Sequence, residues 1–261
     1  MRALSIAATG MLAQQTNVEV IANNLANMNT TGFKRQRAEF EDLLYQNLER
    51  SGTASSDAGT VVPSGVQIGV GVRTASVYRV SDQGNLASTE NPYDIAVQGR
   101  GFFRIQMPDG SDGYTRAGAF ALSPEGQLVT SRGYTVAPGI AIPQEAISVT
   151  VNAQGQIQAL LAGQTAPQTL GQLELVRFAN EGGLQAVGDN LFVESAASGG
   201  ALTGIPGSAG FGTIVQGFLE TSNVNAVAEI TALITAQRAY EMNSKVISTA
   251  DEMLSMTSRL R

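Results

Sequence analysis

Apolar residues recur near the N-terminus at alternating spacings of three and four positions. All but one of the residues at these spacings are apolar: Leu4, Ala7, Met11, Gln14, Val18, Ile21, Leu25 and Met28. Such spacing is typical of the buried seam between two coiled helices. We therefore predict a helix over residues 3–28, with Gly32 as its C-terminal breaker.

A second helical pattern closes the chain, with apolar residues that return every seven positions. The repeating set includes Leu233, Tyr240, Ile247 and Leu254. Asn225 is a candidate N-cap, and Glu229 suits the positive end of the helix dipole. The pattern predicts a helix over about residues 225–261, and we expect the two end helices to pair.

The middle of the chain changes to strand patterns. Apolar and polar residues alternate over 66–80, which predicts one long strand. Short apolar runs follow, separated by turns rich in glycine, proline and asparagine, and they cover 95–97, 103–107, 128–129, 147–151, 173–178 and 191–193. The predicted fold class is α+β, with paired long terminal helices, coiled-coil-like, flanking an antiparallel β-rich middle domain.

These patterns divide the chain into four parts. Residues 1–32 plus 222–261 form a helical assembly domain, 33–65 a linker or bridging segment, 66–194 a β-rich outer domain, and 195–221 a flexible return segment. Apolar residues four apart also allow an amphipathic helix early in the bridging segment. From its position we expect this segment to bridge neighbouring subunits, through Phe33, Lys34, Arg35, Arg37, Phe40 and Leu44.

The first helix is unusual in its polar residues. Residues 3–33 contain a single charged side chain, Glu19, yet asparagine occupies positions 23, 24, 27 and 29. A helix with one wet face normally carries charge there, whereas amides tolerate burial when they find partners. We expect copies of the chain to surround this helix; an ordinary two-helix pair within one chain is the alternative. The predicted subunit interface comprises Leu4, Met11, Val18, Ile21, Asn23, Asn24, Leu25, Asn27, Met28, Leu233, Tyr240, Ile247 and Leu254.

Composition excludes several kinds of chemistry. The chain contains no histidine and no cysteine, so it has no Ser-His-Asp triad, cysteine nucleophile, His/Cys zinc site or disulfide. A net charge of −6 argues against a nucleic-acid partner. No apolar run is long enough to cross a membrane, and polar residues interrupt the N-terminal run before a secretory signal could form. We expect no membrane insertion, no cofactor and no metal.

The remaining motifs indicate structure more than catalysis. Asp109 to Gly113 starts like a calcium loop but lacks the later acidic ligands, so a hairpin tip is favoured. Glu90 and Asp94 are the nearest carboxylate pair that a hydrolase could use, and nothing distinguishes them from surface carboxylates. Lys34, Arg35 and Arg37 form the one basic cluster, which we interpret as a solvated face or part of a subunit contact.

Long stretches of the sequence resemble the bacterial flagellar rod and hook proteins. Residues 7–34, AATGMLAQQTNVEVIANNLANMNTTGFK, are similar to the N-terminal signature of that family. Its C-terminal signature resembles residues 217–254, GFLETSNVNAVAEITALITAQRAYEMNSKVISTADEML. Between them, NPYDIAVQGRGFFRIQ at 91–106 and YTRAGAFALSPEGQLVTSRGYTV at 114–136 resemble its shared β domain. The likeness extends over nearly the whole chain.

The resemblance implies a structural subunit and no enzymatic activity. Chain length and residues 33–53 favour a distal rod subunit, with a proximal rod or hook subunit as the alternative within the family. Such a subunit polymerises into a rigid helical tube that acts as a drive shaft, with the terminal helices inside and the β domain outside. The implied neighbours are further copies, proximal rod proteins, the hook protein and the periplasmic and outer-membrane ring proteins. The implied location is the rod crossing the periplasm, reached through the type III export apparatus without a cleaved signal peptide.

Two functions of other classes remain as alternatives. An exported β-rich adhesin would normally show a signal peptide or tandem repeats, and the sequence has neither. A cell-wall hydrolase would depend on carboxylates such as Glu90 and Asp94.

Overall fold

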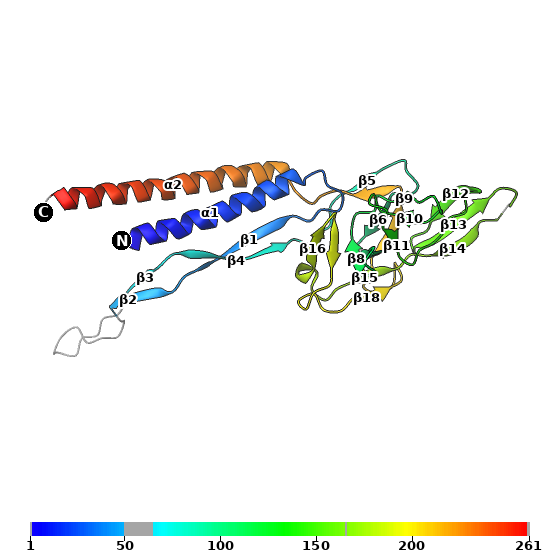
Figure 1. The fold of residues 1–261 in the computed structure, drawn as a ribbon, viewed down its shortest axis with the longest axis horizontal. Helices are drawn as coiled ribbons and strands as arrows, with labels where there is room; N and C mark the ends of the chain where they lie inside the picture. Colours follow the sequence, from blue (N-terminus) through cyan, green and yellow to red (C-terminus); the bar gives the residue numbers. More distant parts are fainter. Residues whose placement is uncertain (1, 50–64, 165, 260–261) are drawn as a thin grey trace. The chain divides into compact units, whose positions relative to one another are not determined.

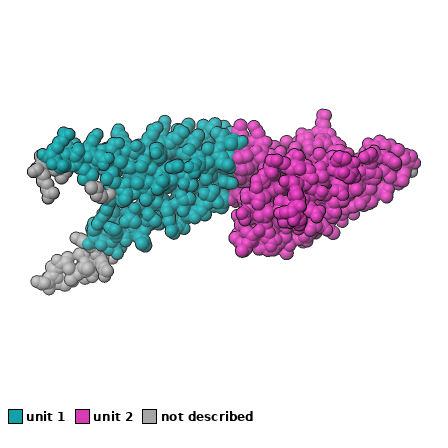
Figure 2. All heavy atoms as spheres, viewed as in Figure 1, with its two compact units in different colours: residues 1–26, 36–78, 225–261 teal, residues 27–35, 79–224 magenta. Residues whose placement is uncertain are grey.

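The structure, a computed structural model, describes residues 2–49, 65–164 and 166–259. The chain forms two compact units, coloured separately in Figure 2. Unit 1 comprises residues 1–26, 36–78 and 225–261, and unit 2 comprises 27–35 and 79–224. Residues 36–78 therefore group with the terminal helices, whereas the sequence pattern divided them between a linker and the β domain.

Two long helices dominate unit 1, as the sequence predicts (Figure 1). Helix α1 spans Arg2–Ala26 and helix α2 spans Ala226–Arg259, and the two pack against each other. The Asn225 side chain caps α2, because its Oδ1 accepts a hydrogen bond from the Ala228 N–H at 3.2 Å. The fold class predicted for the ends of the chain is confirmed.

A β arm, defined as residues 36–49 and 65–78, completes unit 1. Strand β1 (Gln36–Asp42) pairs with β4 (Val72–Arg79), and β2 (Tyr45–Glu49) pairs antiparallel with β3 (Val66–Gly69). The amphipathic helix allowed after Phe33 is therefore wrong, since strand pairing overrides the four-residue spacing.

The single long strand predicted over 66–80 is also wrong. It breaks at Gly71, whose φ of +132° only glycine adopts readily, and a Cβ there would collide with the Thr9 side chain of α1. The arm stays connected across the break because the Leu43 N–H donates to the Gly71 carbonyl at 2.8 Å.

Unit 2 is built mainly from one nine-stranded antiparallel sheet. Its strands are β7 (Phe102–Gln106), β8 (Asp112–Thr115), β9 (Ala121–Leu122), β10 (Leu128–Val129), β11 (Thr135–Val136), β15 (Leu175–Arg177), β16 (Gln185–Gly188), β17 (Leu191–Val193) and β18 (Leu202–Gly204). Strand β7 lies at its centre and pairs with β8, β11 and β15. The β-rich middle domain predicted from the short apolar runs is confirmed.

Smaller sheets extend unit 2. The three-stranded sheet contains β12 (Ala146–Val151), β13 (Gln156–Leu161) and β14 (Gln168–Gln172). Two further pairs join β6 (Ile95–Gln98) to β19 (Thr213–Gln216) and β5 (Leu86–Ser88) to β20 (Phe218–Glu220), and a 3₁₀ turn covers Glu181–Gly183. Strands β19 and β20, together with β18 of the large sheet, lie in residues 195–221, the predicted return segment, so that part of the chain contributes to the sheets.

The core of unit 2 lies between these sheets. Phe103, Ile105 and Leu175 are completely enclosed, and Phe103 meets Phe120 edge-to-face with ring centroids 5.2 Å apart. A second aromatic cluster gathers Tyr114 and Phe178, also edge-to-face, at 4.8 Å. Inward-facing residues from many strands thus supply the apolar burial that stabilises a β domain.

Candidate functional site

The seam between α1 and α2 is formed by small and polar side chains. On α2 the seam residues recur every seven positions as Glu229, Ala236, Asn243 and Ala250. On α1 Gly10 faces the Asn243 amide, so that a Cβ at this glycine would lie 2.9 Å from Nδ2. The absence of side-chain bulk lets the two helices approach closely, and the pairing leaves most large apolar residues outside the seam.

The sequence-predicted interface residues occupy mixed environments in the single chain. Ile21 is buried, and six others are half-buried: Leu4, Met11, Val18, Leu25, Leu233 and Ile247. Met28, Tyr240 and Leu254 are 40 %, 44 % and 40 % exposed. The bulky heptad positions of α2 therefore lie beside the seam or outside it. Ala236 and Ala250 were missed because the prediction selected large apolar residues, although the seven-residue spacing of small residues was present in the sequence.

Asn24 is the exception among the asparagines, because its amide is fully used within the chain. Its Oδ1 accepts from the Gln36 N–H and its Nδ2 donates to the Gln36 carbonyl, both at 2.8 Å. The same Nδ2 donates to the buried Glu229 carboxylate at 3.1 Å. Asn24 is only 1 % exposed. The expectation that this amide acts between subunits is therefore wrong, because Gln36 and Glu229 already occupy it.

The other two predicted asparagines are more accessible. Asn23 lies exposed on α1, and Asn27, in the turn that follows, is half-buried. Asn27 accepts a hydrogen bond at its Oδ1 from the Thr30 hydroxyl at 3.1 Å. A role for Asn23 and Asn27 between subunits stays a prediction.

The face of α2 opposite the seam exposes large apolar side chains. We define this outer stripe by its members: Val227, Ile234, Met242 and Met256. Their exposed fractions run from 46 % for Ile234 to 76 % for Val227. A row of exposed large apolar side chains marks an interaction surface, because such side chains contribute no burial energy while they remain in water.

The arm carries a second exposed apolar surface. Leu44 is 85 % exposed, and Tyr45 and Leu48 are more than half exposed. Of the other residues predicted to bridge subunits, Phe33, Arg35 and Phe40 are half-buried and Arg37 is exposed. The Gly/Ser-rich stretch 51–60, which we expected to be a linker, lies outside the described residues. A two-stranded ribbon alone is marginally stable in water, so an exposed apolar arm favours packing against another surface.

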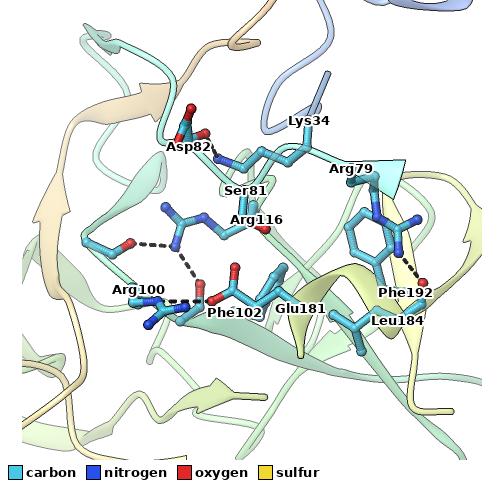
Figure 3. Close-up of a pocket in the computed structure, with 12 residues that line it drawn as sticks. Lys34, Arg79, Ser81, Asp82, Arg100, Phe102, Arg116, Glu181, Leu184 and Phe192 are labelled. Atoms are coloured by element: carbon cyan, nitrogen blue, oxygen red, sulfur yellow. Dashed lines mark hydrogen bonds and ion pairs between the residues drawn. The ribbon is translucent and has the colours of Figure 1, made fainter. Parts of the chain in front are cut away.

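Lys34 belongs to a buried ion cluster in unit 2. Its Nζ donates to Glu220 Oε1 at 2.5 Å and to the Asp82 carbonyl at 2.9 Å. Arg116 donates from Nε to the other Glu220 oxygen at 2.8 Å. Its NH1 donates to the carbonyls of Gly99 and Gly101 (Figure 3). All three side chains are at least nine-tenths buried. The interpretation of Lys34 as part of a solvated face is wrong, because this cluster joins the segment after α1 to β20.

The cluster borders a cavity of about 200 Å³, drawn in Figure 3. Across it, Arg79 lies over the Phe192 ring at 4.6 Å and donates to the Leu184 carbonyl. Burial lowers the pKa of Lys34 below its ordinary value, and the Glu220 carboxylate opposes that shift. Burial likewise lowers the pKa of Arg79. The cations of the lining are therefore already engaged by carboxylates, carbonyls or an aromatic face.

The catalytic and metal alternatives find little geometric support. Asp109 accepts two hydrogen bonds from Ser111 at the hairpin tip between β7 and β8, as the turn pattern predicts. Asp94 is buried and bonded by the Asn91 amide at 3.0 Å, whereas Glu90 is exposed. Within the described residues, no group of three acidic side chains could hold a metal, and no helix is long and apolar enough to span a membrane.

Comparisons with known proteins identify the family. Three family descriptions match: "Flagella basal body rod protein" at residues 4–34, "Flagellar hook protein FlgE/F/G D1 domain" at 96–159, and "Flagellar basal body rod FlgEFG protein C-terminal" at 215–260. These matches cover both helical ends and the centre of unit 2. They overlap the four stretches of sequence that carry the resemblance: one at each end of the chain and two in the β domain.

Full-length relatives are also similar. The "Flagellar basal-body rod protein FlgG" of Caulobacter vibrioides is 60 % identical over 261 residues, covering 100 % of both chains. A protein of the same name from Agrobacterium fabrum is 54 % identical, and the alignment covers 99 % of each chain. Another from Borreliella burgdorferi is 49 % identical, and the alignment covers 100 % of this chain and 99 % of the relative. The chain belongs to the FlgG family of flagellar basal-body rod proteins, which are structural and not enzymatic.

Proposed function

We propose that this subunit of the distal rod polymerises through unit 1 into a rigid helical tube that transmits torque. The observation that carries the proposal is the exposed outer stripe of α2, together with the exposed apolar residues of the arm. Full burial of a Val, Ile or Met side chain stabilises by ~1.5–3 kcal/mol, so contacts along one helix can add up to a strong subunit interface.

The two predicted surfaces have different roles in this proposal. The helical residues on and beside the seam, from Leu4 to Met28 and from Leu233 to Leu254, contact neighbouring copies inside the tube. The arm crosses to further copies and stiffens the shaft, a role that also falls to residues 51–60. Unit 2 faces outward.

The proposed neighbours outside the polymer are those of an axial component in the basal body. Proximal rod proteins lie at one end of the tube and the hook protein at the other, and the ring proteins surround it in the periplasm and outer membrane. Export through the type III apparatus as an unfolded chain fits a protein without disulfides. The resemblance of both termini to the axial family supports this set of partners.

Polymerisation of the purified chain tests the proposal. We expect hollow tubes by electron microscopy for the natural chain, and their loss for Ile234→Glu, because a carboxylate placed on the outer stripe would be desolvated in the contact. Ile147→Glu in unit 2 is the matched control, since Ile147 is 69 % exposed and lies outside the stripe. Normal tubes from Ile234→Glu, or no tubes from the natural chain, would contradict the proposal.

A further inference from the structure

Unit 1 contains an open groove between α1 and the arm. Leu12, Thr16 and Glu19 line it from α1, and Leu43, Val72 and Arg73 line it from the arm, around a cavity of about 420 Å³. The two walls are joined where the Val72 N–H donates to the Thr9 hydroxyl at 3.3 Å. Leu12 stays 64 % exposed although it points into the groove. The groove thus offers apolar surface that the single chain does not cover.

One carboxylate of the groove lacks a cationic partner. Glu19 accepts a hydrogen bond from the Gln15 amide at 3.1 Å, and no cation in the described part of the chain lies within ion-pair distance of it. Arg73, on the opposite wall, is already paired with Glu41 at 2.8 Å. The groove therefore combines an apolar surface with a negative charge available to a partner.

The outer stripe of α2 complements the groove, because it combines exposed apolar side chains with positive charge. Arg238 follows Ile234 by four residues and precedes Met242 by four, and Lys245 follows three residues later, so all four side chains share one helix face. Neither cation has a carboxylate within ion-pair distance among the described residues. Because this face lies opposite the seam, the stripe cannot enter the groove of its own chain.

We propose that the groove receives the outer stripe of α2 from a second copy of this chain, with Arg238 and Lys245 beside Glu19. The inference rests on the proposed polymerisation and names its contact surfaces. A contact between two different surfaces of the same chain is heterologous, and such contacts repeat into open helical assemblies when they do not close into a ring. The apolar residues supply the burial, and the opposite charges set the register.

Cysteine cross-linking tests the contact, in a chain with no native cysteine. Leu12→Cys is mixed with Ile234→Cys or Met242→Cys, the mixture is polymerised, and disulfides between copies are followed under oxidation. Gln237→Cys and Ser244→Cys are matched controls, because these residues are exposed on the same helix but lie outside the stripe. A disulfide needs Cα atoms ~4.4–6.8 Å apart, so only the correct face can react efficiently.

The expected result is a heterotypic disulfide between Leu12→Cys and at least one stripe position. This disulfide should form on the order of 10²-fold faster than the disulfide between Leu12→Cys and either control position, because a fixed contact raises the local thiol concentration. Equal rates for stripe and control positions in well-formed tubes would overturn the groove contact while leaving polymerisation intact. Failure of the cysteine-free natural chain to polymerise would instead overturn the proposed function on which the inference rests.

A charge exchange provides an independent measurement. Glu19→Lys should slow polymerisation, and adding Arg238→Glu with Lys245→Glu should restore it, because the exchange recreates opposite charges. Glu125→Lys makes the same charge change at an exposed position of unit 2 and should polymerise normally. Undiminished polymerisation of Glu19→Lys, or no recovery in the triple variant, would contradict the assigned charge pairing.

Discussion

At the residue scale, buried polar groups decide how unit 1 holds together. Asn24 joins three elements, since it binds both backbone groups of Gln36 at the start of β1 and the Glu229 carboxylate of α2. An asparagine inside a helix disfavours that helix on propensity alone. Its position here is explained by the partners that it satisfies, and the stability gained lies in the tertiary contact.

Replacing Asn24 should destabilise unit 1 in the assembled tube. Asn24→Leu removes the partner of the Gln36 N–H and carbonyl, and an orphaned buried group costs ~1–3 kcal/mol. We expect tubes of this variant to lose helical signal at a lower urea concentration than tubes of the natural chain, measured by circular dichroism. Ala22→Leu, which places the same side chain at an exposed position of α1, is the control. Identical urea midpoints for the two variants would show that the Asn24 amide contributes nothing inside the chain.

The ion cluster of unit 2 supports a second residue-scale prediction. Arg116→Met leaves Lys34 as the one cation paired with Glu220 and orphans the carbonyls of Gly99 and Gly101, so we expect a loss of ~3–5 kcal/mol in unfolding free energy. Lys34→Met should cost less, because Arg116 still neutralises Glu220 and the desolvation cost of a buried ammonium disappears. Urea titration followed by tyrosine fluorescence measures both. A larger loss for Lys34→Met would contradict this assignment of the charges.

Neither cluster could be predicted from local sequence. Lys34 and Glu220 lie 186 positions apart, and Asn24 and Glu229 lie 205 apart. Lys34 stands beside two arginines, a context that normally indicates a solvated surface. The segment meets β20 through a long-range backbone contact, in which the Gly32 N–H donates to the Glu220 carbonyl at 2.8 Å. Long-range topology therefore decides burial, and local charge pattern does not.

At the element scale, helices were predictable and the arm was not. Alternating three- and four-residue spacings over 25 residues specify α1, and a seven-residue period specifies α2. Phe40, Leu44 and Leu48 also lie four apart, yet they belong to an extended arm whose strands pair with residues 66–79. A short apolar spacing fits helix and strand equally well, so the pairing partner decides.

The arm carries a prediction of its own. Leu44, at the break between β1 and β2, is 85 % exposed, and we expect a neighbouring subunit to cover it in the rod. Leu44→Asp should leave the folding of the chain unchanged and yield rods that bend more or stop short in electron micrographs. Ile147→Asp, at an exposed position of β12, should give straight rods. Straight, full-length rods from Leu44→Asp would argue against a bridging arm.

At the scale of the whole molecule, the terminal helices have more apolar surface than a single chain buries. Within the described residues of α1 the buried apolar side chains are Ala7, Ala13, Val20 and Ile21. The two larger ones contribute ~1.5–3 kcal/mol each on full burial. Ordering the backbone of the 25 residues of α1 costs ~1–2 kcal/mol for each residue. Most helical stability in proteins comes from the packing of an apolar face, so neighbouring subunits must supply most of the stabilising contacts.

We therefore expect the terminal helices to fold stably only during polymerisation. Amides of residues 3–28 should exchange with deuterium in the full-length monomer at rates close to those of an unfolded chain, whereas β7 and β15 of unit 2 stay protected. Helical circular dichroism should rise as tubes form. Strong protection of residues 3–28 in a verified monomer would contradict this mechanism, because it would show that the small-residue seam suffices to stabilise the helix pair. The outer stripe would then dock onto a helix already in place, and assembly would bury surface without ordering the chain.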